Sequence, residues 1–143
     1  MYKRILVPLD QSDRAEQALP HAAALAAALH SQVTLVGVID VRDQKAAHEA
    51  GVTLDWEAQI QDLGAYLEAL CARMVAEGVR CSGQVLTGAV AEEIVRYARE
   101  KQIDLIVLAT PGGSEMSRWV HGSLADQLVA GAPLPILLVR TEE

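Results

Sequence analysis

Residues 5–29 read ILVPLDQSDRAEQALPHAAALAAAL, a short apolar run, a polar break and a longer amphipathic segment. The run Ile5–Leu9 is typical of a β-strand buried on both faces, as in a parallel sheet. Ser12 is a residue type that caps helices, and apolar residues recur after it at helical spacing as far as Leu29. Pro20 interrupts the pattern, since inside a helix it removes a hydrogen bond and clashes with the preceding turn, so we expect a kink or break there.

The same alternation of strand and helix continues to the end of the chain. Apolar runs predict strands at residues 33–39, 80–86, 103–109 and 136–139, and helical periodicity predicts helices at about 56–74, 90–101 and 123–131. The stripe from Trp56 to Met74 is expected to face the core, whereas residues 41–53 are polar and Ala-rich and predict a loop or a frayed helix start. Alternating elements of this kind indicate an α/β fold, a parallel sheet with helices on both faces.

Length and composition restrict the class of protein. The 143 residues fit one domain, 1–143, and with no Phe the core must be built from Ala, Leu, Val and Ile. A formal charge of −7 argues against nucleic acid and anionic membranes as partners. The N-terminus lacks the pattern of a secretion signal and no apolar run is long enough to span a membrane, so we expect a soluble cytoplasmic protein.

The cysteines and histidines give no metal-binding pattern. Cys71 and Cys81 belong to no metal-ligand motif, and we interpret them as buried free thiols in preference to a disulfide or redox pair. The four histidines do not cluster in the sequence, which argues against a zinc site. No nucleophile oriented by a base is recognisable, so no catalytic residue is assigned, and His121 is given a structural or phosphate-edge role.

Two strand ends carry the candidate binding residues. Thr110-Pro111-Gly112-Gly113 follows the fourth strand, and Gly122-Ser123 opens the next helix. Glycines near a strand end and a helix N-terminus together make a phosphate cradle, although Pro-Gly by itself is more often an ordinary turn. Asp10 ends the first strand, where it either contacts a ligand or accepts hydrogen bonds from the following turn. Asp40 ends the second strand, and is either a solvated carboxylate or joins Asp10 in holding Mg²⁺ through water.

The sequence resembles the universal stress protein family over nearly its whole length. The resemblance is carried by ILVPLDQS at the start, GAVAEEIVRYA at 88–98, IDLIVLAT at 103–110 and GSLADQLVAGAPLPILLVR at 122–140. It implies a Rossmann-like, adenine nucleotide alpha-hydrolase-like fold with an open five-stranded sheet of order 3-2-1-4-5. It also implies a homodimer formed through the C-terminal strand, Ile136 to Val139.

Family members that bind ATP share a loop written Gly-x2-Gly-x9-Gly-Ser/Thr. Gly112, Gly122 and Ser123 match this loop, whereas its first glycine falls on Ala109. Glu115 also stands where many nucleotide-binding relatives carry glycine. These two departures support the alternative of a family member that binds no nucleotide.

The resemblance also implies a role for each binding residue. Asp10 contacts the adenine or ribose, Pro8 and Val38 line the base pocket, and Leu108 and Ala109 border the ribose. The remaining residues would serve the phosphates: Gly112, Gly122, Ser123 and Leu124, with Ser114 as a further ligand.

The sequence therefore predicts a small dimeric stress-response protein that binds ATP, with or without Mg²⁺, at the carboxyl ends of strands 1 and 4. At most slow hydrolysis is expected, because the GxxxxGK[ST] pattern of dedicated phosphoryl-transfer sites is absent. The alternative function is a universal stress protein that acts through protein–protein interaction alone.

Overall fold

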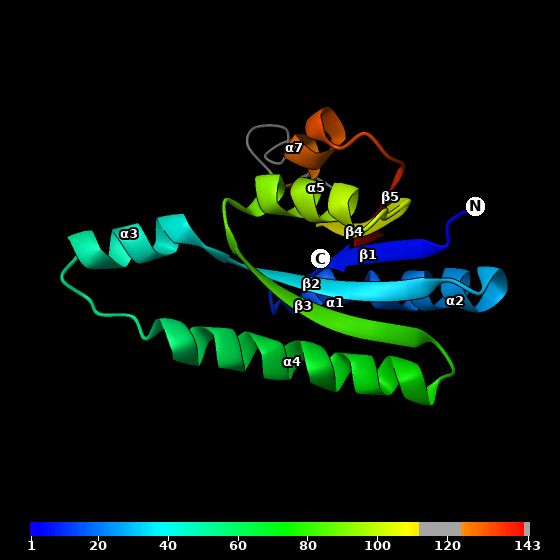
Figure 1. The fold of residues 1–143 in the computed structure, drawn as a ribbon, viewed down its shortest axis with the longest axis horizontal. Helices are drawn as coiled ribbons and strands as arrows, with labels where there is room; N and C mark the ends of the chain where they lie inside the picture. Colours follow the sequence, from blue (N-terminus) through cyan, green and yellow to red (C-terminus); the bar gives the residue numbers. More distant parts are fainter. Residues whose placement is uncertain (112–123, 142–143) are drawn as a thin grey trace.

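The computed structural model describes residues 1–111 and 124–141. In chain order the elements are β1 (Arg4–Pro8), α1 (Asp13–Glu16), α2 (Leu19–Leu29), β2 (Gln32–Asp40), α3 (Val41–Glu49), α4 (Trp56–Ala76), β3 (Arg80–Gly88), α5 (Val90–Glu100), β4 (Leu105–Pro111), α7 (Leu124–Gly131) and β5 (Ile136–Thr141). The strands form one parallel five-stranded sheet of order β3-β2-β1-β4-β5 (Figure 1). The predicted fold class and strand order are confirmed.

Helices cover both faces of the sheet, because the central strands are apolar on both sides. Ile5 and Val7 of β1 lie in one core cluster with residues of α2 and α4. Leu6, which points to the opposite face, lies in a second cluster with residues of α5 and α7. All three side chains are fully buried. The two faces are visible in Figure 1, where α4 lies below the sheet and α5 and α7 lie above it.

The break predicted near Pro20 is confirmed. Ser12 caps α1, since its hydroxyl accepts a hydrogen bond from the N–H of Ala15 at 3.1 Å. The chain leaves α1 after Glu16 and starts α2 at Leu19, with Pro20 in the first turn of the new helix. Proline is tolerated there because an N–H in the first turn has no partner within the helix. The break therefore falls just before Pro20.

Within residues 41–53, for which a loop or a frayed helix start was predicted, residues 41–49 form a separate helix, α3. Asp40 caps this helix by accepting a hydrogen bond from the N–H of Arg42 at 2.9 Å. The helix has no buried residue and lies beyond the carboxyl end of β2, away from the sheet (Figure 1). A helix held by its cap, without an apolar face, leaves little periodic signal in the sequence.

The predicted core stripe of α4 is correct in its later turns and wrong at its start. Leu63, Leu67 and Met74 are buried, whereas Trp56 and Ile60 are only half-buried. The first turns of α4 run past the ends of the strands (Figure 1), so no sheet covers them. At 21 residues α4 is long, but no helix in the described part of the chain is long and apolar enough to cross a membrane.

A glycine in β2 sets how closely α4 lies on the sheet. A Cβ added to Gly37 would stand 2.7–2.9 Å from side-chain carbons of Leu63. We predict that Gly37→Ala lowers the free energy of unfolding by about 1–3 kcal/mol through overpacking. Gly64→Ala is the matched control, because its Cβ would meet nothing nearer than Val85 at 3.9 Å. It should raise stability by about 0.5–1 kcal/mol, as alanine does in a helix interior.

Urea unfolding followed by circular dichroism measures both variants. A Gly37→Ala protein as stable as the parent would show that α4 does not depend on this close approach.

Candidate functional site

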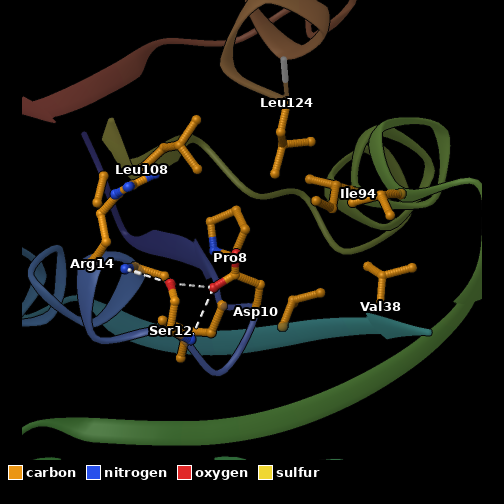
Figure 2. Close-up of a pocket in the computed structure, with 13 residues that line it drawn as sticks. Pro8, Asp10, Ser12, Arg14, Val38, Ile94, Leu108 and Leu124 are labelled. Atoms are coloured by element: carbon orange, nitrogen blue, oxygen red, sulfur yellow. Dashed lines mark hydrogen bonds between the residues drawn. The ribbon is translucent and has the colours of Figure 1, made fainter. Parts of the chain in front are cut away.

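A pocket opens at the carboxyl ends of β1 and β4, the two strands from which the chain proceeds toward opposite edges of the sheet (Figure 2). In parallel α/β sheets this is the position where ligands bind. Six segments line it: Pro8, Leu9 and Asp10 at the end of β1, Ser12, Arg14 and Ala15 at α1, Val36 and Val38 in β2, Val90 and Ile94 in α5, Leu108 and Ala109 in β4, and Leu124 in α7.

Pro8 explains why the sheet opens here. The pairing of β1 with β4 extends over Ile5 with Leu105 and Leu6 with Ile106. On the other side, the N–H of Leu9 still donates to the carbonyl of Val36 in β2, at 2.8 Å. Successive residues of a strand direct their N–H groups to opposite sides, so position 8 would direct its N–H toward β4. Proline has no N–H, and the ladder cannot continue at this position.

The structure brings together the predicted site residues that it describes. Pro8, Asp10, Val38, Leu108, Ala109 and Leu124 all line the pocket. The predicted phosphate ligands Gly112, Ser114, Gly122 and Ser123 lie outside the described residues, as do Glu115 and His121. The described strand-end residues are therefore neighbours, and their contact with a ligand stays a prediction.

Asp10 is held in one orientation by the turn that follows it. Its Oδ1 accepts hydrogen bonds from the backbone N–H of Ser12 at 3.0 Å and from the Ser12 hydroxyl at 2.5 Å (Figure 2). Because Ser12 also caps α1, the carboxylate, the turn and the helix form one connected unit. The predicted turn role of Asp10 is therefore confirmed, and its contact with a ligand stays a prediction.

Asp40 is not among the pocket-lining residues. Its carboxylate pairs with the Arg42 guanidinium at 2.7 Å, in addition to capping α3. The hydrogen bond from the Arg42 side chain is the main cause that lowers the pKa of the Asp40 carboxyl. Within residues 1–111 and 124–141, no group of three or more His, Cys, Asp or Glu residues is arranged to hold a metal ion. The structure thus assigns Asp40 to α3 and leaves Asp10 as the strand-end carboxylate of the pocket.

The sequence analysis missed the helical part of the lining. Val90 and Ile94 lie in the segment 90–101, for which the sequence analysis predicts a helix and no binding role. Arg14 gave no signal of its own, because an arginine in the first turn of a helix is ordinarily solvated. It is the one cationic side chain among the described lining residues, and in Figure 2 it extends from α1 toward the side of the pocket occupied by Leu108.

A contact with α4 keeps α1 in place beside the pocket. The Tyr66 hydroxyl donates a hydrogen bond to Glu16 Oε2 at 2.6 Å. Burial, followed by this bond and the Glu16 charge, raises the pKa of the Tyr66 hydroxyl above its ordinary value, so it remains a donor even in alkaline solution. The Glu16 carboxylate is therefore engaged with α4, while Arg14 of the same helix lines the pocket.

The comparisons with known proteins agree on one family. A family model described as the universal stress protein family matches residues 1–140. The universal stress protein MJ0531 of Methanocaldococcus jannaschii is 31% identical over 144 residues, which cover 98% of this chain and 83% of the relative.

Two solved structures have the same fold as this chain and a similar degree of sequence identity to it. That of MJ0577, also from M. jannaschii, has a TM-score of 0.80 at 25% identity, covering 100% of this chain and 99% of the other. A universal stress protein of Archaeoglobus fulgidus was solved in complex with dAMP. It has a TM-score of 0.72 at 25% identity, and the match covers 96% of this chain and 98% of the A. fulgidus chain.

Proposed function

This chain belongs to the universal stress protein family, and from that premise we propose that it is a cytoplasmic, dimeric stress-response protein that binds an adenine nucleotide. We propose ATP, with or without Mg²⁺, as the ligand, bound in the pocket at the carboxyl ends of β1 and β4. The observation that carries the proposal is the gathering of Pro8, Asp10 and Val38 with Arg14 around one opening at the switch point of the sheet.

The two sides of the pocket match the two ends of a nucleotide. Val38 gives one side an apolar surface suited to the faces of a purine base, with the fully buried Val36 and Ile94 packed around it. Asp10 provides a fixed acceptor for ribose hydroxyls or the amino edge of the base. The related A. fulgidus protein was solved with dAMP, which supports an adenine nucleotide as the class of ligand.

Arg14 supplies the charge that a phosphate requires. Asp13 and Glu16 flank it on α1, and the whole chain carries a formal charge of −7, so a triphosphate would otherwise meet a negative surface. A guanidinium pairs with phosphate oxygens through two parallel hydrogen bonds. We therefore add Arg14 to the predicted phosphate ligands Gly112, Ser114, Gly122, Ser123 and Leu124.

We propose at most slow hydrolysis. Asp10 is the one carboxylate among the described lining residues, and its Oδ1 already accepts two hydrogen bonds from Ser12. A carboxylate whose oxygen already accepts two hydrogen bonds is poorly placed to act as a general base that activates water.

The position of Ala109 favours nucleotide binding over the alternative of a pure interaction protein. The whole residue is only 7% exposed and belongs to the core cluster shared with α2 and α4. Most of its surface is therefore covered by the core, and the methyl group takes little space from the pocket. Glu115, the other departure from the family loop, lies outside the described residues.

Thermal melting with ATP tests the proposal. At a hundredfold excess of ATP over Kd the stabilisation is about 2.7 kcal/mol, which corresponds to about 5–10 °C in Tm. Val38→Trp should abolish this shift because the indole fills the apolar side of the pocket. Val41→Trp is the control, since Val41 is 44% exposed and outside the lining. A melting curve unmoved by millimolar ATP, ADP or AMP would reject nucleotide binding and favour the interaction protein.

The role of Arg14 is tested by comparing a ligand that carries phosphates, ATP, with one that carries none, adenosine. Arg14→Gln should weaken ATP binding about tenfold to a hundredfold, the effect of losing a charged hydrogen-bond donor, and leave adenosine binding unchanged. Calorimetric titration measures both ligands. Arg42→Gln is the matched control, because that arginine pairs with Asp40 outside the pocket. Equal ATP affinities in the Arg14→Gln protein and the parent would remove Arg14 from the site.

We propose that the dimer forms through the C-terminal strand, Ile136 to Val139. β5 is an edge strand, and Leu137 and Leu138 are 38% and 45% exposed on it. Leu138→Lys should yield a monomer in sedimentation at micromolar concentration, because a charged edge resists pairing. Val75→Lys, at a 55% exposed position of α4, should leave the dimer intact. A parent protein that is already monomeric would refute this interface.

A further inference from the structure

Two thiols lie in contact between α4 and β3. The Cys71 and Cys81 sulfurs are 3.0 Å apart, with the S–H of Cys81 donating to the sulfur of Cys71. Cys71 is buried, as expected, whereas Cys81 is half-buried, and no disulfide bond joins them in this structure. A disulfide bond measures about 2.05 Å, so the sulfurs need to approach by about 1 Å to form one.

The contact follows from the close packing of α4 on β3. Gly83 lies two residues after Cys81 and therefore on the same face of the strand. A Cβ at Gly83 would stand 3.0 Å from the Cβ of Leu67 and 3.8 Å from the Cys71 sulfur. The absence of that side chain lets the helix approach the strand, and the approach brings Cys71 to Cys81.

The two sulfurs differ in their access to solvent. Cys81 lines a surface hollow at the start of β3, together with Gly78, Val79 and Arg80. Cys71 is 8% exposed and lies behind it in the core cluster of α4. A small oxidant that enters the hollow therefore meets Cys81 first, and the product formed there is within reach of Cys71.

We propose that Cys71 and Cys81 are a redox modification site, at which a peroxide converts the two thiols into an intramolecular disulfide joining α4 to β3. The Cys81 thiolate attacks a peroxide oxygen, so an S–O bond forms, the O–O bond breaks and hydroxide leaves. The Cys71 sulfur then displaces the sulfenic oxygen, which departs as water. In sum, two thiols and one hydrogen peroxide give one disulfide and two waters.

The surroundings of the pair determine its behaviour. Burial raises the pKa of both thiols, so little thiolate exists at neutral pH and the pair should react slowly, only under prolonged exposure to peroxide. The crosslink spans a sequence separation of 10 residues and ties the edge strand β3 to α4. Its formation restricts the unfolded chain and should raise the Tm by several degrees.

Intact-mass spectrometry of peroxide-treated protein tests the proposal. The parent should lose the mass of two hydrogen atoms, resist alkylation of both cysteines when unfolded in denaturant and melt several degrees higher, and dithiothreitol should reverse all three changes. In Cys71→Ala, Cys81 should be trapped by dimedone as a sulfenic acid. In Cys81→Ala, Cys71 should remain alkylatable for longer under the same treatment.

Three results would overturn the site. In the first, both thiols of the parent protein are still alkylatable after prolonged treatment with peroxide. In the second, a cysteine is oxidised to sulfinic acid without a crosslink. In the third, disulfides form only between chains. If the single variants fold poorly, the change in mass and its reversal in the parent protein still decide the question.

Discussion

The early end of the pairing between β1 and β4 is the constraint on which the pocket depends. The two strands pair as far as Leu6 and Ile106, and the missing N–H of Pro8 stops the ladder at the next position that would face β4. The strands lie at the centre of the sheet, packed on both faces, so the opening forms in a rigid frame. The turn through Asp10 and Ser12 then brings α1 to the edge of this opening.

The sequence predicted the architecture well because this fold has a strong local signal. Strands buried on both faces are continuous apolar runs, and the helices between them bury one stripe each. The prediction left α3 undecided between a loop and a frayed helix start, and it was wrong at the first turns of α4, where the helices extend beyond the sheet (Figure 1). The cap that Asp40 provides is a single side chain, and the first turns of α4 continue an apolar stripe although they run past the ends of the strands.

The candidate site was predicted to the extent that it lies at strand ends. Asp10 was a candidate because it ends a strand, whereas Pro8, Val38, Leu108 and Ala109 were assigned through the resemblance to the universal stress protein family; all five line the pocket. Arg14, Val90 and Ile94 reach the pocket only through the packing of α1 and α5, which no local pattern encodes. The contact between Cys71 and Cys81 depends in the same way on the missing side chain at Gly83.

A titration of the amide NMR spectrum with ATP tests the central claim, that the pocket between the ends of β1 and β4 binds an adenine nucleotide. The account predicts that shifts concentrate at the described pocket residues of β1, α1, β2, α5 and β4, including Asp10, Arg14, Val38 and Ile94. The amides of α4 around Cys71 should stay unchanged. A spectrum without shifts at millimolar ATP, or with shifts confined to residues away from this pocket, would contradict it.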